Sequence, residues 1–453
     1  MSRSGRQRTA VLPPRPDRLP ASGLWMALTL TLAVLSLLSF GTILLALPPE
    51  EGFVPFPLAL AALHLYTLGF LVPVLLTAVS LLSASLFLQD VPRLDPGILF
   101  LPVVWLGGVG VALGFVLFLG FLPWAGTLLT VASLTVAGSA AFRIRAGLAP
   151  TRELGLGIGL GLVGLLATLV VGVVMALGYT GAEPWPPPLL LHLALAAGAA
   201  FVPMLMAVSQ QVFPMFAHCP PAPRPLHRMG PALWEATGTA LLVLGVLTGR
   251  AVLRDVGAIA IALALAVWLI IQERMYAHRH GKTHDPAAWG ARIGALSLVL
   301  GAWLSTAGLL GTVSGGRVAG SGSWVGAGIA LVLLGGIGGS VVAYVRRILP
   351  FVIWNLLFRR FGRAEFLPKL DRLRPRLPVQ ILPVAWALGS AVVAFSMGAV
   401  HPQAIWERWG DAHNTWLLAA AIWLAGIELL WSVLKGGRIW AAHRREAHRG
   451  GTL

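Results

Sequence analysis

Four histidines stand in or beside long apolar stretches of the sequence, where an imidazole can do chemistry that an aliphatic side chain cannot. His64 lies in LALAALHLYTLGFLVPVLL, and His192 lies in LHLALAAGAAFVPMLMAVS. His401 follows a later apolar stretch, and His413 opens the next one. Neutral imidazole ligates copper and heme iron, and ionisable residues inside apolar spans are rare and usually functional. We therefore predict His64 and His192 as cofactor-binding or metal-binding residues; a structural imidazole bonded to a neighbouring helix is the alternative. His401 and His413 are either further metal ligands or interfacial residues.

Three other polar residues interrupt apolar stretches, namely Gln210, Glu235 and Glu428. Gln210 follows His192 by 18 residues, or five helical turns, so both side chains project from one face of a helix. Glu235 lies near the start of its stretch, and we expect it to reach the membrane surface. Glu428 lies well inside its stretch and should be protonated or paired. These three residues are predicted to line a proton or substrate path.

The elements that must position these residues are membrane-spanning helices. Of the 453 residues, 57% are hydrophobic and 11% are charged, whereas a typical soluble domain has about 25% charged residues. An apolar run of about 20 residues crosses a bilayer as a helix. The sequence therefore predicts an all-α polytopic bundle of about 12 transmembrane helices over residues 23–436. The predicted spans are 23–47, 57–82, 97–122, 125–142, 154–179, 187–213, 231–249, 252–272, 289–311, 323–348, 378–400 and 412–436.

The distribution of basic residues predicts the orientation of the bundle. If the N-terminus is cytoplasmic, 29 Lys and Arg residues lie inside and four lie outside, which are Arg250, Arg254, Arg317 and Arg408. This asymmetry is the one that cytoplasmic loops show. We therefore expect both termini to be cytoplasmic in a bacterial inner membrane, with a basic segment at 1–22 and a basic tail at 437–453. The net charge of +16 indicates topology and attraction to anionic lipid, not nucleic-acid binding.

Two basic segments that contain aromatic residues, 349–377 and the tail, predict anchors on the membrane surface. The pattern GLGLVG lies inside the fifth predicted span and not after a strand, so it indicates helix packing and not dinucleotide binding. The single cysteine, Cys219, excludes a disulfide within the chain.

The motifs HLYTLGFL in the second span, AVSQQVFPMF in the sixth and ILPFVIWNLLFRRFG after the tenth resemble the catalytic-subunit-like branch of the heme-copper oxidase superfamily. The NnrS-like nitric-oxide-response proteins are another relative of this type. The resemblance implies that His64 matches a heme ligand, that His192 loosely matches a copper ligand, and that Arg408 pairs with heme propionates. The chain departs from the oxidase pattern because its seventh and tenth spans contain no histidine, and because Gln210 stands where those proteins often have tyrosine.

These departures predict that the chain alone does not reduce dioxygen, because copper and two hemes need more ligands than two intramembrane histidines supply. One heme b or one copper ion remains possible, for a role in redox chemistry, nitric-oxide handling or metal homeostasis. The alternative is a proton-coupled secondary transporter that uses Gln210, Glu235 and Glu428. A cofactor-free structural subunit that partners other membrane subunits of a respiratory complex is the third interpretation.

Overall fold

The structure is a computed structural model that describes residues 21–46, 56–86, 95–146, 152–179, 189–222, 225–280, 285–313, 321–361, 373, 381–398 and 412–449. Every element in these ranges is helical. The elements are α1 (Ala21–Ala46), α2 (Phe56–His64), η1 (Leu65–Leu71), α3 (Val72–Leu86), α4 (Pro96–Leu99), α5 (Leu101–Leu117), η2 (Leu119–Phe121), α6 (Leu122–Ala146), α7 (Arg152–Tyr179), α8 (Leu189–Leu193), η4 (Ala194–Phe201), α9 (Val202–Ala217), α10 (Pro225–Thr248), α11 (Ala251–Ala277), α12 (Pro286–Val313), α13 (Ser321–Ala330), η5 (Leu331–Gly338), α14 (Gly339–Phe361), α15 (Ile381–Gly398) and α16 (Ala412–Arg449).

The bundle has the length and surface of a membrane protein. Within the described ranges, 11 helices are long and apolar enough to cross a bilayer, and α15 contributes a shorter apolar run over Ile381–Ala394. Large apolar side chains such as Leu117, Phe142 and Val252 are more than two-thirds exposed on its outside, where a soluble protein would carry charge. The prediction of an all-α polytopic membrane bundle is therefore confirmed. We number the spans 1 to 12 in chain order.

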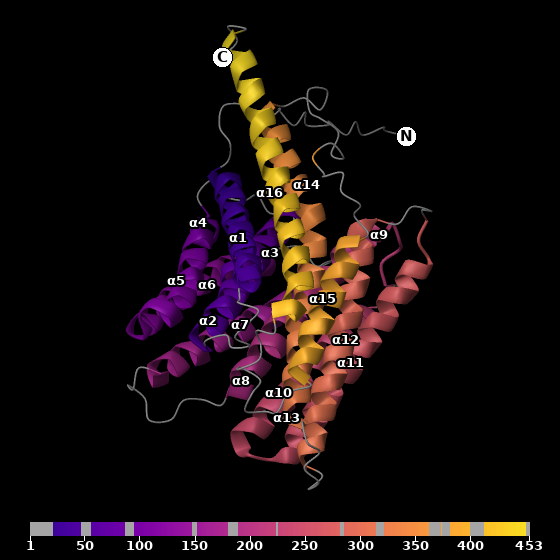
Figure 1. Ribbon diagram of the computed structural model, residues 1–453. Coiled ribbons are helices and arrows are strands. Elements are labelled where there is room, and N and C mark those ends of the chain that lie inside the picture. The colour runs from indigo at the N-terminus through magenta and orange to yellow at the C-terminus, as the bar shows by residue number, and fades with distance from the viewer. Residues whose placement is uncertain are drawn as a thin grey trace, which may run out of the picture.

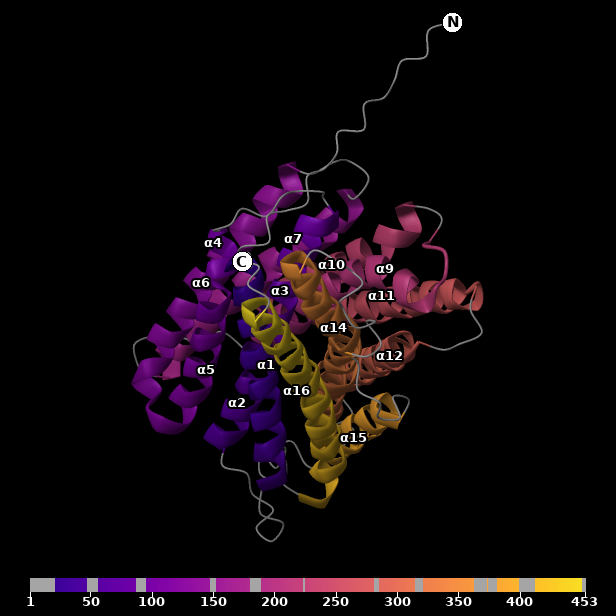
Figure 2. The same cartoon turned by 90° about the horizontal axis from the view of Figure 1, so that it is seen from above.

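The helices pack mostly against their neighbours in the chain, and the first and last spans close the bundle. Figure 2 shows α1 beside α16 and α15 on the other side of α16, and both pairs are in contact. Short connections such as the one between α10 and α11 produce antiparallel pairs. Gly245 and Gly257 lie in that pair, where the facing backbone leaves no room for a side chain, so close approach of the two helices depends on glycine.

Spans 2, 6 and 10 each contain a π-helical segment in the interior of the span, namely η1, η4 and η5. In η1 and η4 the wide turns end two residues before a proline, Pro73 or Pro203. Proline has no N–H, and its ring clashes with the carbonyl four residues earlier, so a wider turn relieves the clash. His64 immediately precedes η1, and His192 lies two residues before η4. Each histidine thus lies shortly before the π-helical segment of its span.

The π-helical segment of span 10 has backbone carbonyls that are bonded by side chains of other spans. The Tyr66 hydroxyl donates to the Leu333 carbonyl at 3.3 Å, and the Trp386 Nε1–H donates to the Leu334 carbonyl at 2.7 Å. A carbonyl without a partner inside a membrane costs free energy. These two bonds therefore compensate for the irregular turn.

Replacing Trp386 with phenylalanine should lower the free energy of unfolding by about 2 kcal/mol, because the buried Leu334 carbonyl loses its donor. Thermal unfolding in detergent, followed by circular dichroism, measures the effect. Trp234→Phe is the control, because that side chain is 42% exposed on the outside of the bundle. Equal melting temperatures for the two variants would contradict the role of the hydrogen bond.

The helices of spans 10 and 12 continue into the two segments that we predict to be membrane-surface anchors, and their role as anchors stays a prediction. The helix of span 10 continues to Phe361, and α16 continues to Arg449 without a break. α16 has 38 residues, which at ~1.5 Å per residue exceeds the thickness of a bilayer. Figure 1 shows α16 extending past the other helices with α14 beside it. Gly436 lies against Ile353, so the helices of spans 10 and 12 pack together near the ends of the two spans.

Candidate functional site

The orientation of His64 is fixed by its own helix. Nδ1 lies 2.7 Å from the Leu60 carbonyl, and because a carbonyl can only accept, Nδ1 carries the hydrogen. Nε2 is then the nitrogen with a free lone pair, as in histidines that bind metals. The ring also lies 4.8 Å from the Phe115 ring, at a tilt of 39°. The side chain is therefore held in one tautomer and one orientation.

His192 has a ring nitrogen without a hydrogen-bond partner. Its Nδ1 is buried and makes no hydrogen bond, although the Thr168 backbone lies near the ring. Gly172 of the neighbouring α7 leaves the space that the ring occupies, since a Cβ at this glycine would lie 3.2 Å from His192 Cε1. A buried polar atom without a partner is costly and usually indicates a function or an absent ligand. Sequence reasoning did not identify Gly172.

His64 and His192 line the same cavity. This cavity has a volume of about 190 Å³. Its walls come from spans 2 to 6, with Leu333 of span 10 closing one side. The structure thus brings together the two intramembrane histidines singled out in the sequence.

The rest of the cavity wall is almost entirely apolar. The described lining residues include no Lys, Arg, Asp or Glu. The Thr67 and Thr168 hydroxyls donate to carbonyls of their own helices at 2.9 and 2.8 Å. Tyr179 and Leu189 lie at the end of span 5 and the start of span 6, so the cavity reaches the end of the bundle that is predicted to face outward. The cavity therefore suits a largely apolar group that is ligated by imidazole.

The other predicted ligands cannot be placed beside this cavity. His401 and Arg408 lie outside the described residues, and His413 lies in the first turn of α16 with its side chain outside them. In the part of the chain that the structure describes, no three His, Cys, Asp or Glu side chains form a group that could hold a metal ion. A metal bound in the cavity would have two described protein ligands, His64 and His192.

Glu235 is buried between helices, whereas Gln210 is half-buried. Glu235 is 0% exposed, so the expectation that it reaches the membrane surface was wrong. Its Oε1 accepts from the Thr239 hydroxyl at 2.8 Å, while Oε2 has no described partner. Thr239 lies against Gly198 of η4, and this contact holds the acid inside the bundle. Both amide atoms of Gln210 are also buried without a hydrogen-bond partner.

Glu428 is paired, which is one of the two states that we expected for it. Arg346 at the end of span 10 donates through Nη2 to Oε1 at 2.7 Å, and Nε lies 2.7 Å from Oε2. Both side chains are more than nine-tenths buried. Sequence reasoning counted Arg346 only as part of the basic inner surface. The pair connects spans 10 and 12 where α14 and α16 lie together.

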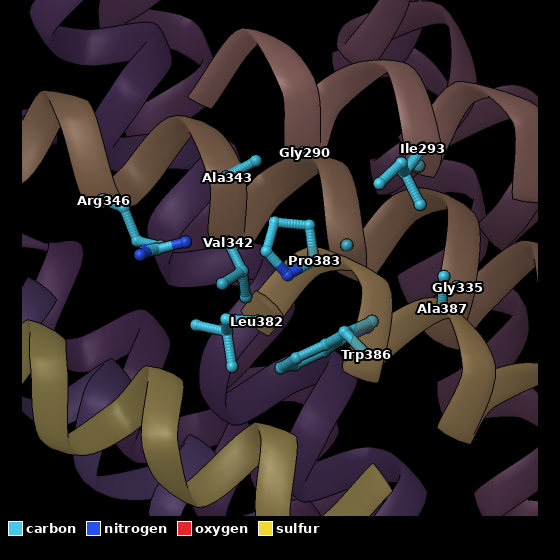
Figure 3. Close-up of a pocket in the computed structure, with 12 residues that line it drawn as sticks. Gly290, Ile293, Gly335, Val342, Ala343, Arg346, Leu382, Pro383, Trp386 and Ala387 are labelled. Carbon is cyan, nitrogen blue, oxygen red and sulfur yellow. The ribbon is translucent and has the colours of Figure 1, made fainter. Parts of the chain in front are cut away.

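Figure 3 shows the pocket beside Arg346, which lies between α12, span 10 and α15. Gly290, Pro383 and Trp386 contribute to its wall. Its volume is about 10 Å³, which leaves room for about one water molecule. This pocket is too small for an organic substrate.

Another group of polar residues, which the sequence did not reveal, lies in the half of the bundle that is predicted to face the cytoplasm. The Ser209 and Tyr344 hydroxyls are 2.7 Å apart and join spans 6 and 10. Gln272 of α11 approaches the same tyrosine hydroxyl, but its amide makes no hydrogen bond of good geometry. Ser209 precedes Gln210 in the chain, so span 6 carries polar residues at both of its ends.

The thiol of Cys219 should react slowly with alkylating reagents. It follows α9 outside the spans, and burial raises the pKa of its thiol. Because the thiolate is the reactive form, iodoacetamide at pH 7.5 should label the folded protein several times more slowly than the denatured protein. Mass spectrometry of timed samples measures this, and equal rates would contradict the burial of Cys219.

The comparisons with known proteins assign no family. No family model matches the chain, and no curated protein sequence matches it significantly.

Proposed function

We propose that the cavity between spans 2 and 6 binds heme b through His64 and His192, and that the chain is a heme-binding protein of the bacterial plasma membrane with both termini in the cytoplasm. The observation that carries the proposal is that two imidazoles from different spans line one apolar cavity. A heme with two imidazole ligands supplies one-electron transfer. The chain would then act in electron transfer and not as an oxidase by itself.

The residues that line the cavity fit this group. Nε2 of His64 is available, and the Leu60 carbonyl that accepts from Nδ1 makes that ring a stronger ligand. His192 has a buried nitrogen without a partner. Apolar walls match the faces of a porphyrin and exclude water. The two carboxylates of heme need water or cations, and the cavity reaches Tyr179, which is 48% exposed. Arg408 stays the proposed partner of those carboxylates.

The test is the absorbance of protein purified in detergent from heme-replete cells, together with heme extraction and metal analysis. We expect a Soret band and about one heme b per chain. Bound copper without heme would indicate that His64 and His192 ligate copper and not heme iron. A colourless, metal-free protein would contradict the proposal.

Replacing Gly172 with leucine should reduce heme occupancy several-fold, because the new side chain would meet the His192 ring and fill the cavity. Gly159→Leu is a matched control, since it lies in the same helix and a Cβ there would meet nothing within 4 Å. Heme content per folded chain measures the difference. Equal loss of heme in both variants would contradict the assigned position of the ligand.

One observation favours proton-coupled transport as a second candidate. Glu235 is fully buried, lacks a described cation partner and has a free oxygen. Intramembrane acids of this kind are common in proton relays. Proteoliposomes that contain a pH-sensitive dye should then show proton uptake driven by a potassium-diffusion potential, and Glu235→Gln should abolish that uptake. Uptake equal to that of empty liposomes would remove this candidate.

A further inference from the structure

A group of cations and aromatic rings lies where spans 8 and 9 meet the predicted cytoplasmic surface. The Tyr276 ring has two guanidinium groups over it, with the Arg292 carbon at 4.0 Å and the Arg279 carbon at 4.5 Å from its centroid. Arg292 also lies 5.1 Å from the Trp289 ring. Two positive charges therefore lie beside the same buried aromatic ring.

The charge of this group is only partly compensated. Arg292 makes a two-pronged contact with Glu273, in which Nε donates to Oε1 at 2.7 Å. Arg279 donates through Nη1 to the Tyr276 carbonyl at 3.4 Å, and its Nε makes no hydrogen bond. Across the described ranges, no carboxylate lies within ion-pair distance of Arg279. One positive charge thus remains beside a tyrosine that is 5% exposed.

Hydrogen bonds fix the backbone around Arg279. The Arg279 N–H donates to the Tyr276 carbonyl at 3.2 Å. The next N–H, of His280, donates to the His218 carbonyl at 2.9 Å and ties this turn to the end of α9. Arg279 lies two residues beyond the last residue of span 8, Ala277. If span 8 ends there, we expect this position to lie at the level of the lipid headgroups, where tyrosine and arginine commonly contact the bilayer.

We propose that Arg279 and Arg292 over Tyr276 form a binding site for a phosphate group, which an anionic lipid of the inner leaflet supplies. A guanidinium presents paired donors that match phosphate oxygens, and its charge strengthens these hydrogen bonds. Basic pockets between transmembrane helices on the cytoplasmic side bind such headgroups. The site is separate from the histidine cavity, so the proposal stands whether or not heme binds there.

The test is binding of phosphatidylglycerol to the purified full-length protein, measured by native mass spectrometry after titration from mixed micelles. Phosphatidylcholine is the lipid control. Arg279→Gln should weaken phosphatidylglycerol binding about tenfold, because charge-assisted hydrogen bonds are lost. Arg279→Lys should restore part of the affinity, since lysine keeps the charge without the planar fork. The matched control is Arg274→Gln, which removes the same charge from an exposed residue of the same helix.

A second arm distinguishes a lipid headgroup from free phosphate. Inorganic phosphate at millimolar concentration is titrated against the lipid complex of each variant. Selective loss of phosphatidylglycerol binding in Arg279→Gln, with no displacement by phosphate, supports the lipid site. Displacement by phosphate, with Arg279→Gln abolishing phosphate binding, supports the phosphate site and assigns it to the free ion. Equal weakening by Arg274→Gln and Arg279→Gln would overturn the proposal, because general charge attraction would then explain the binding.

Discussion

Replacing His64 with alanine should remove nearly all heme from the purified protein. Of the two cavity histidines, His64 is the one whose ring is oriented by both a hydrogen bond, to Leu60, and an aromatic contact, with Phe115. If His64 ligates the heme iron, its loss would remove both the bond to the metal and the hydrogen bond that orients the ligand. We expect heme content at least tenfold below that of the wild type, measured by heme extraction per folded chain.

The matched control is His278→Ala. His278 also has its Nδ1 2.7 Å from the carbonyl four residues earlier, but its side chain is exposed outside the spans. The two substitutions therefore remove the same kind of local hydrogen bond, and only His64 lines the cavity. Circular dichroism and gel filtration show whether each variant is folded. Full heme content in folded His64→Ala would contradict the proposed ligation.

Replacing Arg346 with methionine should lower the free energy of unfolding by about 3–5 kcal/mol, because Glu428 would be left as a buried charge without its partner. The double variant Arg346→Met with Glu428→Leu removes both charges. It should regain most of the loss, since well-packed apolar residues often replace a buried ion pair at little cost. Thermal unfolding in detergent at constant pH measures both variants.

A partly exposed ion pair provides the comparison for Arg346. Arg292 pairs with Glu273, whose side chain is 40% exposed, so Arg292→Met should cost less than Arg346→Met. If Arg346→Met melts at the wild-type temperature, the buried pair does not stabilise the contact between spans 10 and 12. If the double variant is no more stable than the single variant, the loss comes from packing and not from the unpaired charge.

The fold could be predicted from the sequence because lipid imposes simple requirements on a chain. Long apolar runs have to form helices, and each of the predicted spans corresponds to one helix or to a consecutive series of helical segments. The shared cavity of His64 and His192 could be anticipated only as a possibility. Their spacing shows that each lies in an apolar span, whereas the relative position of spans 2 and 6 depends on the packing of the whole bundle.

Other features depended on contacts between residues far apart in the sequence. Arg346 and Glu428 are separated by 82 residues, and nothing local distinguishes Arg346 from the neighbouring basic residues. Glu235 looked able to reach the surface because it lies early in its span, but Gly198 and Thr239 bring spans 6 and 7 together around it. Pro73 and Pro203 are visible in the sequence and indicate an irregular turn in each of their spans. The third wide turn, in η5, has glycines in place of proline.

The most direct test of a shared ligand is electron paramagnetic resonance of the oxidised, purified protein and of its two histidine variants. Two imidazoles on one iron predict a low-spin heme signal in the wild type. That signal should disappear in both His64→Ala and His192→Ala, with high-spin iron or no heme in its place. A wild-type signal that persists unchanged in His192→Ala would show that the two rings do not meet at one iron.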